Sequence, residues 1–451
     1  MLLSVEIENV QHIEHCSFEV DLSLNQLQCL VGKNGCGKTT LVRAIRNLSI
    51  NDTFQQTGAP YIFDDSSHIS YQVGDKAYSF VFNKKLKAID SRELIDKDIR
   101  QLFGVELPIP HGKRFSHFQE LVKYDSDIRS KIANGDFEVP EELIQFLNRV
   151  YGDDRFNSLK KVSIKNKTFY AILRDPVERF YIREDYLSSG EYFLINLYRY
   201  IHEKRKCIVI DEIDIALDSS AQVKLIEELR RLCELYEVNV IFTTHSLALM
   251  ETLNEGELHY MENSEGKVSI REISHNYAKS ILFGFHKNWD RYILAEDELS
   301  ANFIKYLIHK TGEQIFSKYI VIHFGGAQNT VDIRNRNEAQ EFFSGPENVL
   351  CALDGDQLNV GNLANLKNVV FLPYQDLEHE LGLHWDARHD KIYDEGLNVR
   401  GNSPKKRGKS LLKQYSHNKL KTEFEVFEFL INHSPDGIDE YQAKLIEFLS
   451  R

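Results

Sequence analysis

A glycine-rich stretch near the start of the chain has the spacing of a phosphate-binding loop. It runs Gly32-Lys-Asn-Gly-Cys-Gly-Lys38-Thr39 and fits the pattern G-x-x-x-x-G-K-[ST]. Glycines at these places let consecutive backbone N–H groups surround a phosphate, and the helix expected after them adds its positive end. Lys38 then reaches the terminal phosphates, and the Thr39 hydroxyl binds Mg²⁺. The residues expected to bind a nucleotide here are Gly32, Asn34, Gly35, Gly37, Lys38, Thr39 and Thr40.

A second group of residues suited to phosphate chemistry lies near the middle of the chain. The apolar run Cys207-Ile-Val-Ile210 predicts a strand, and it ends in Asp211-Glu212. An aspartate at this strand end can orient the water molecules of Mg²⁺, and the adjacent glutamate can polarise an attacking water. Three fragments accompany the pair: Leu187-Ser-Ser-Gly-Glu191, Ala216-Leu-Asp218 and Thr243-Thr-His245.

Each fragment has a simpler interpretation when it is taken alone. Ser188 and Asp218 are typical helix caps, and His245 is a histidine at the end of a strand. Together and in this order, however, the fragments form a specific pattern. The residues expected to complete the nucleotide site are Ser188, Gly190, Asp211, Glu212 and His245.

Acidic residues also follow predicted strands in the second half of the chain. Carboxylates that leave adjacent parallel strands at one edge converge, and they repel unless a divalent cation lies between them. Two such cations would activate water and stabilise the leaving oxygen of a phosphodiester. The alternative is that these acids cap helices or lie in solvated turns. The acids concerned are Glu296, Asp354, Asp356 and Glu378.

A basic stretch follows these acids. Eight Lys or Arg residues and no acidic residue lie between Arg400 and Lys421, with Tyr415 and His417 among them. Such a stretch suits contacts to nucleic-acid phosphates. The alternative is an ordinary solvated face.

An α/β framework is needed to position these residues. The strand at 207–210, a helix with an apolar face and the strand at 238–242 form a βαβ unit, which predicts a parallel sheet covered by helices. A second alternation of strand and helix patterns, in the second half of the chain, predicts four more strands and the helices that accompany them. The expected strands are 291–295, 319–324, 348–353 and 368–372, and the expected helices are 298–309, 331–343 and 376–383.

Two domains are expected, one over residues 1–285 and a smaller one over 286–451. The composition of residues 86–160 is charged and favours helix, with breaks at Pro108, Pro110 and Pro140. This segment predicts a helical arm inserted into the first domain. It lacks the sustained heptads of a long coiled coil.

The composition indicates a soluble, cytoplasmic protein. With 42% hydrophobic residues the chain can bury a core, which argues against disorder. Its net charge of −13 means that a polyanion must meet a local basic patch or a bound cation. There is no apolar run of membrane-spanning length, and Glu6 and Glu8 interrupt any signal peptide. The six cysteines form no C-x-x-C pair, which favours reduced, buried thiols over a zinc or disulfide framework.

The ordered motifs of residues 1–275 resemble those of the ABC-type ATPases, in the branch that includes chromosome-maintenance and recombination ATPases. The resemblance implies that Lys38 and Thr39 bind ATP and Mg²⁺, that Asp211 and Glu212 are the Walker B pair and that His245 senses the γ-phosphate. It also implies a signature loop, with Ser188 and Gly190, that acts on the nucleotide of a partner subunit and therefore requires a head-to-head homodimer or higher oligomer. The loop departs from the commonest form at Ser189 and Glu191, and Gln119 is the one proposed residue for the glutamine loop, with a surface helix position as the alternative.

Residues 288–385 resemble the Toprim nuclease domain of the overcoming-lysogenisation-defect (OLD) family, in which an ABC ATPase precedes a Toprim domain. The acids occur in the family's order, with Gly325-Gly326 between the first and the second. The resemblance implies a Mg²⁺- or Mn²⁺-dependent DNA endonuclease and a role in bacterial defence against phage. By position, the implied metal ligands are Glu296, Asp354, Asp356 and Glu378.

One departure and one ambiguity remain within this resemblance. Many family members have a second acid four residues after the first, where this chain has Ser300, and Glu298 is the possible substitute. The family's late lysine falls in the basic stretch, where Lys405, Lys406, Lys409 and Lys413 are equally placed.

The sequence therefore leaves two alternative functions open. One is an ATP-regulated, metal-dependent DNA endonuclease. The other is an ATPase sensor or scaffold whose degenerate Toprim-like domain controls a co-encoded toxin, nuclease or nucleoprotein partner.

Overall fold

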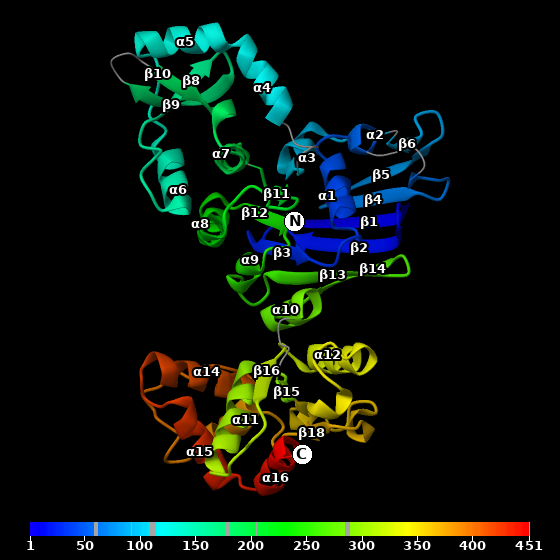
Figure 1. The fold of residues 1–451 in the computed structure, drawn as a ribbon, viewed down its shortest axis with the longest axis vertical. Helices are drawn as coiled ribbons and strands as arrows, with labels where there is room; N and C mark the ends of the chain where they lie inside the picture. Colours follow the sequence, from blue (N-terminus) through cyan, green and yellow to red (C-terminus); the bar gives the residue numbers. More distant parts are fainter. Residues whose placement is uncertain are drawn as a thin grey trace. The chain divides into compact units, whose positions relative to one another are not determined.

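The computed structural model describes residues 1–57, 62–91, 93–108, 114–175, 180–203, 205–284 and 289–450. The chain divides into two compact units, Met1–Glu272 and Ile273–Arg451, which are described separately below (Figure 1). Pro110 and the expected boundary between residues 285 and 286 lie outside the described residues. Within them, no helix is long and apolar enough to cross a membrane.

Unit 1 is built on one large mixed sheet of 11 strands, in the order β6-β5-β4-β1-β2-β14-β13-β3-β12-β11-β7. Its antiparallel part alternates buried and exposed side chains, as in Leu3, Val5 and Ile7 of β1, because one face packs on the core. The strands of this part are β1 (Leu2–Val10), β2 (Ile13–Asp21), β4 (His68–Val73), β5 (Lys76–Asn83), β6 (Ala88–Asp90), β13 (Leu258–Ser264) and β14 (Lys267–Glu272). Two hairpins of this part turn at Gly74-Asp75 and at Ser264-Glu-Gly266.

The other part of this sheet is parallel, and its strands are buried along almost their whole length. Its strands are β3 (Leu27–Val31), β7 (Phe103–Glu106), β11 (Cys207–Ile210) and β12 (Asn239–Thr243). The helices of this part are α1 (Lys38–Asn47), α2 (Thr53–Thr57), α3 (Lys97–Leu102), α7 (Ser189–His202), α8 (Ser219–Tyr236) and α9 (Leu247–Glu251). The predicted βαβ unit is therefore present as β11, α8 and β12.

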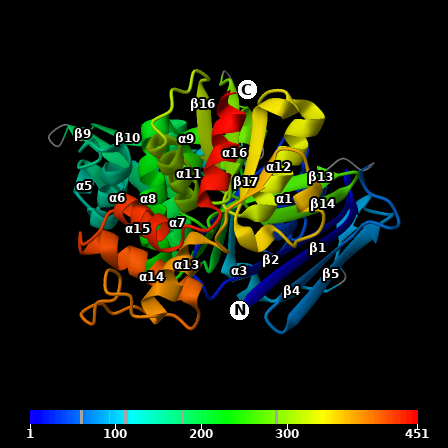
Figure 2. The ribbon, with the colours of Figure 1, turned by 90° about the horizontal axis from the view of Figure 1, so that it is seen from below.

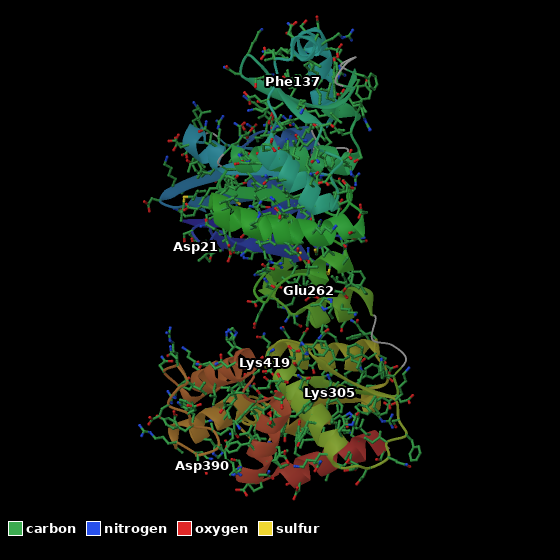
Figure 3. The ribbon with its side chains drawn as sticks, turned by 90° about the vertical axis from the view of Figure 1, so that its left-hand side faces the viewer. Asp21, Phe137, Glu262, Lys305, Asp390 and Lys419 are labelled. Carbon is green, nitrogen blue, oxygen red and sulfur yellow. The ribbon has the colours of Figure 1, made fainter. Side chains whose placement is uncertain are left out.

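A small subdomain is inserted between β7 and α7. It comprises α4 (Arg114–Lys123), α5 (Asp125–Asn134), α6 (Glu141–Tyr151) and the antiparallel sheet β8 (Leu159–Ile164), β9 (Lys167–Asp175) and β10 (Phe180–Arg183). Figure 1 shows α4, α5 and the three strands lying together, and Figure 3 labels Phe137 in this region of unit 1 and Asp21 and Glu262 on the main sheet.

The insertion differs from the helical arm expected over residues 86–160. The first part of that range holds β6, α3 and β7, and β7 is the edge strand of the main sheet beside β11. The helices begin only at Arg114. A strand of four residues, Phe103-Gly-Val-Glu106, is too short to show against charged, helix-favouring neighbours, so composition alone concealed it.

Unit 2 contains a parallel sheet of four strands in the order β16-β15-β17-β18. The strands are β15 (Arg291–Ala295), β16 (Tyr319–His323), β17 (Val349–Leu353) and β18 (Val369–Phe371). The helices are α10 (His275–Phe283), α11 (Glu298–Lys310), α12 (Ala327–Gln340), α13 (Leu377–Asp386), α14 (Pro404–His417), α15 (Glu423–His433) and α16 (Ile438–Ser450). The four expected strands and the three helices between and after them are thus confirmed. The chain as a whole has the predicted α/β fold.

Candidate functional site

The glycine-rich loop joins β3 to α1, as its spacing requires. Gly35 and Gly37 have φ angles of 80° and 110°, a region that residues with a Cβ atom rarely occupy. Lys38 opens α1 and is 7% exposed, and its Nζ donates to the carbonyl oxygen of Gly32 at 2.8 Å. The loop therefore already curls around the lysine ammonium, with Asn34 exposed at its tip.

The two threonines after Lys38 differ in their surroundings. Thr39 is half-buried at the start of α1, whereas Thr40 is buried and its hydroxyl donates to Gln11 Oε1. Gln11 lies in the turn between β1 and β2. The Thr40 hydroxyl is thus engaged within the protein, and its expected contact to nucleotide stays a prediction.

Asp211 and Glu212 follow β11 at the carboxyl edge of the parallel sheet. Asp211 is 3% exposed, and its Oδ1 accepts a hydrogen bond from Thr243 Oγ1 at 2.6 Å. Its other oxygen, Oδ2, is buried without a hydrogen-bond partner among the described residues. A buried carboxylate oxygen without a donor is costly unless a cation or water satisfies it. This donor fits a hard divalent cation such as Mg²⁺.

Glu212 has a backbone conformation that is unusual for a residue with a side chain. Its φ angle is 54°, and its N–H donates to Thr243 Oγ1 at 2.7 Å, which holds the strained turn in place. Burial, together with Asp211 and Asp214, raises the pKa of Glu212, while Lys38 opposes the shift. A glutamate with a raised pKa is a stronger base than an ordinary carboxylate.

His245 lies just beyond the end of β12 and is exposed. Partial desolvation and the Lys38 ammonium lower the pKa of His245, which favours a neutral imidazole at pH 7. Its backbone N–H faces Asp214 Oδ1 at 3.4 Å. The charge of Lys38 therefore acts on both Glu212 and His245 at this edge of the sheet.

The stretch around Ser188 forms the predicted helix cap. Ser188 Oγ accepts from the Glu191 N–H at 3.2 Å, and Glu191 Oε2 accepts from the Ser188 N–H at 2.8 Å, so the pair is a capping box. Gly190 is buried against Ala216, and a Cβ atom there would lie 2.6 Å from the Ala216 oxygen. The capping interpretations of Ser188 and Asp218 are thus confirmed, and a signature role for Ser188 and Gly190 stays a prediction.

Sequence reasoning missed three residues of this region. Glu106 ends β7, and its carbonyl oxygen accepts from the Asp211 N–H at 3.1 Å while its carboxylate accepts from Tyr200. Asp214 and Gln222 connect the loops after β11 and β12. These three residues belong to no recognisable sequence motif, because their contacts depend on how strands that are distant in the sequence align. Gln119 is exposed on α4.

A cluster of carboxylates forms at the carboxyl edge of the unit 2 sheet. Glu296 follows β15 and Asp354 follows β17, and both are buried at 8% and 4% exposure. Glu296 Oε1 accepts from the Asp354 N–H at 2.8 Å, which fixes the two side by side. Asp376 and Glu378, at the start of α13, are also buried and act electrostatically on Asp354 or on each other. The sequence therefore placed Glu296, Asp354 and Glu378 correctly at one edge and left out Asp376.

Burial, with neighbouring negative charges adding to it, raises the pKa values of the carboxyls in the cluster. Burial raises the pKa of Glu296 to about 7 and, with the help of Glu296 and Asp297, that of Asp354 to about 8. Burial and Asp297 also raise the pKa of Glu378. Hard carboxylate oxygens with unbalanced charge are a donor set that suits Mg²⁺ or Mn²⁺.

Ser300 belongs to this cluster, whereas Glu298 does not contact it. The Ser300 hydroxyl is buried and donates to Asp354 Oδ1 at 3.1 Å, while Glu298 is exposed on α11. Asp356 is also exposed, and its oxygen accepts from Gln357. Across the part of the chain that the structure describes, no three His, Cys, Asp or Glu side chains already stand in a metal-holding arrangement.

Two of the four candidate lysines face these acids. Lys405 Nζ lies 3.0 Å from Asp376 Oδ2, and Lys409 Nζ lies 3.9 Å from Glu378 Oε1. Both lysines are on α14, which lies beside α13 (Figure 2). The helices approach closely because Gly408 has no side chain, and a Cβ atom there would collide with the carbonyl oxygen of Glu378. Lys405, which also acts on Glu296 and Asp354, is the best-placed lysine.

Comparison with known proteins agrees with the geometry of unit 1. A protein-family model described as "AAA domain" matches residues 4–254, which is more than half of the chain. The chain belongs to this family. The AAA-domain match spans the glycine-rich loop, the Asp211-Glu212 pair and His245, so unit 1 is an ABC-type P-loop ATPase domain.

Among curated proteins, this chain is similar to several transport or import ATP-binding proteins. Oligopeptide transport ATP-binding protein OppF of Mycoplasma genitalium is 30% identical over 115 residues, which is 25% of this chain but only 13% of that protein's length. Phosphonates import ATP-binding protein PhnC of Lactobacillus acidophilus is 24% identical over 52% of this chain and 74% of its own length. OppD of Lactococcus lactis subsp. cremoris is 21% identical over 62% of this chain and 73% of its own length.

Solved structures with a similar course of the chain include two SMC head domains. The SMC head domain from Thermotoga maritima has a TM-score of 0.36 and 14% identity, over 60% of this chain and 98% of its own. The Smc head domain from Pyrococcus furiosus has a TM-score of 0.39 and 11% identity, over 62% of this chain and 99% of its own.

Proposed function

We propose that unit 1 binds and hydrolyses Mg²⁺-ATP. The observation that supports this most directly is the buried Oδ2 of Asp211, which has no hydrogen-bond partner in the part of the chain that the structure describes and lies beside Glu212. Thr39 and Asp211 would hold the Mg²⁺, which supplies charge neutralisation for the transferred phosphate. Lys38 binds the terminal phosphates, and Glu212 takes the proton of the attacking water. His245, kept neutral, contacts the γ-phosphate.

The same proposal includes self-association through the ATPase unit. Ser188 is exposed at the N-terminus of α7, where the helix dipole favours an anion. In a head-to-head homodimer this terminus faces the nucleotide of the second copy. Glu212→Gln should therefore trap ATP and a dimer, because it removes only the base, while Lys38→Ala should lose ATP binding. Hydrolysis by Glu212→Gln at the wild-type rate would show that the base lies elsewhere.

For unit 2, we propose a divalent-metal-dependent DNA endonuclease. The carboxylate cluster at the sheet edge, with two lysines of α14 against it, supports this activity. Glu296, Asp354, Asp356 and Glu378 would hold Mg²⁺ or Mn²⁺, which would activate water and stabilise the leaving oxygen of a phosphodiester. Asp356 is exposed and therefore free to turn toward a cation. Lys405 neutralises the scissile phosphate, and the remaining basic residues of α14 contact the DNA backbone.

The biological role that fits these two units is a cytoplasmic defence effector against phage, in line with the resemblance to the OLD family. A second function is favoured by Ser300, which occupies the place of an acid and donates to Asp354 instead of binding metal. In that case unit 2 is a degenerate Toprim-like domain, and the ATPase controls a partner toxin, nuclease or nucleoprotein.

Incubation of purified protein with plasmid DNA and Mn²⁺, with and without ATP, distinguishes the two functions. The endonuclease predicts nicked or linear plasmid, lost in Asp354→Ala and Glu296→Ala with ATPase activity nearly unchanged. Glu313→Ala, which changes an exposed acid beyond the end of α11, is the control and should cleave as wild type does. Cleavage that persists in both cluster variants would show that the nuclease site lies outside the carboxylate cluster. No cleavage by the wild-type protein would favour the second function, an ATPase that controls a partner.

A further inference from the structure

The loops that follow β11 and β12 are joined by hydrogen bonds along their whole length. At their start, Thr243 Oγ1 donates to Asp211 and accepts from the Glu212 N–H. Next, the Ile213 N–H donates to the carbonyl oxygen of Thr243 at 3.1 Å. Asp214 Oδ1 then accepts from Thr244 Oγ1 at 2.6 Å.

Gln222 closes this set of contacts from α8. Its side chain is 7% exposed, and its Nε2 donates to the carbonyl oxygens of Asp214 at 3.1 Å and Leu217 at 2.8 Å. Its Oε1 accepts from Ser246 Oγ at 2.6 Å. A single buried amide therefore holds both ends of the segment 214–217 and, at the same time, the residue after His245.

We propose that Gln222 is a positioning residue that makes the segment 212–217 and the loop 244–246 move as one piece. The proposal rests on ATP binding at the site described above, and it concerns what binding does to the surface. The segment carries Ile215, whose side chain is 60% exposed. Contact of His245 with the γ-phosphate is thereby transmitted to an apolar side chain that faces solvent.

The physical reason lies in the cost of breaking these contacts separately. A buried amide that loses its hydrogen-bond partners destabilises the structure, because nothing then compensates for its removal from water. Movement of one loop without the other would leave the Gln222 amide, the Asp214 carboxylate or the Ser246 hydroxyl without partners. Joint movement keeps every one of these bonds, so it is the less costly response to nucleotide.

A fluorophore at position 215 reports this movement. All six native cysteines are buried, so Ile215→Cys offers one exposed thiol for a maleimide dye. We expect a dye response on addition of Mg²⁺ with a non-hydrolysable ATP analogue. In the Gln222→Leu background, which keeps the side-chain volume but removes all three hydrogen bonds, the response should fall at least fivefold while analogue affinity stays within about twofold.

Two matched variants separate positioning from mere stability. Ser246→Ala removes the bond to Oε1 together with the cap bond that Ser246 Oγ accepts from the Leu249 N–H. Its effect on the dye response should not add to that of Gln222→Leu, because both break the link between Gln222 and Ser246. Gln56→Leu changes a glutamine on α2 that hydrogen-bonds Asp52 at the surface, and it should leave the response intact. A full response in Gln222→Leu, or none in wild type that binds the analogue, would overturn the proposal. Failure of wild type to bind the analogue would instead overturn the ATP site itself.

Discussion

Replacement of Asp354 by asparagine tests how much the buried carboxylate cluster destabilises unit 2 when no metal is present. The pKa of Asp354 rises from 3.8 to about 8 in the folded protein, and its side chain is 4% exposed. A carboxyl whose pKa is raised on folding stabilises the folded state below its unfolded pKa, and this contribution is lost as the pH rises through the folded value. At about 1.4 kcal/mol for each tenfold change in proton affinity, the loss between pH 5 and pH 8 is on the order of 4 kcal/mol.

Asparagine avoids this loss because it keeps an oxygen for the Ser300 hydroxyl and never ionises. The difference in free energy of unfolding between Asp354→Asn and wild type should therefore shift in favour of the variant by several kcal/mol from pH 5 to pH 8. Both tryptophans of the chain, Trp289 and Trp385, belong to unit 2, so tryptophan fluorescence during urea unfolding in EDTA follows this unit.

The exposed Asp356 provides the control. Asp356→Asn should change the free energy of unfolding by less than about 0.5 kcal/mol at both pH values, as surface substitutions usually do. An equal difference between Asp354→Asn and wild type at pH 5 and pH 8 would refute the charge argument, since a loss of packing alone does not depend on pH.

The remaining predictions concern metal, the lysines and two glycines. Mn²⁺ should raise the unfolding midpoint of wild-type unit 2 at pH 8 and leave that of Asp354→Asn nearly unchanged, as measured by the same fluorescence. Lys405→Ala should lower plasmid cleavage at least tenfold, and the loss should be much larger than that caused by Lys413→Ala, which removes one backbone contact on an exposed turn of the same helix. Gly408→Ala should lower cleavage similarly because the methyl group pushes α14 away from Glu378. Gly190→Ala should destabilise unit 1 by about 1–3 kcal/mol in urea unfolding followed by circular dichroism, because its methyl group meets the carbonyl of Ala216.

The parts of the fold that were predictable are those in which local spacing determines structure. The glycine-rich loop requires a strand before it and a helix after it, and β3 and α1 occupy those places. Capping residues such as Ser188 mark a helix start through a contact only three residues away. These features need no knowledge of distant parts of the chain.

The parts that were not predictable depend on contacts between distant residues. Glu106 was missed because β7 is identified as a strand only by its pairing with β11, about a hundred residues later. The bond from Ser300 to Asp354 spans 54 positions, and nothing in the local sequence indicates it. The choice of Lys405 among four lysines follows from a helix crossing that Gly408 permits.

The two units place carboxylates at the same structural position, the carboxyl ends of parallel strands, but they balance the charge differently. In unit 1, Lys38 lies near Asp211 and Glu212, and a bound triphosphate would bring its own cation. In unit 2, burial first and the neighbouring carboxylates second raise the pKa of Asp354 and Glu296, so both retain protons near neutral pH. Protons and divalent cations therefore compete for the same oxygens in unit 2. Because the buried oxygens of unit 1 depend on a ligand and those of unit 2 on pH, metal occupancy of the two sites should respond to different signals.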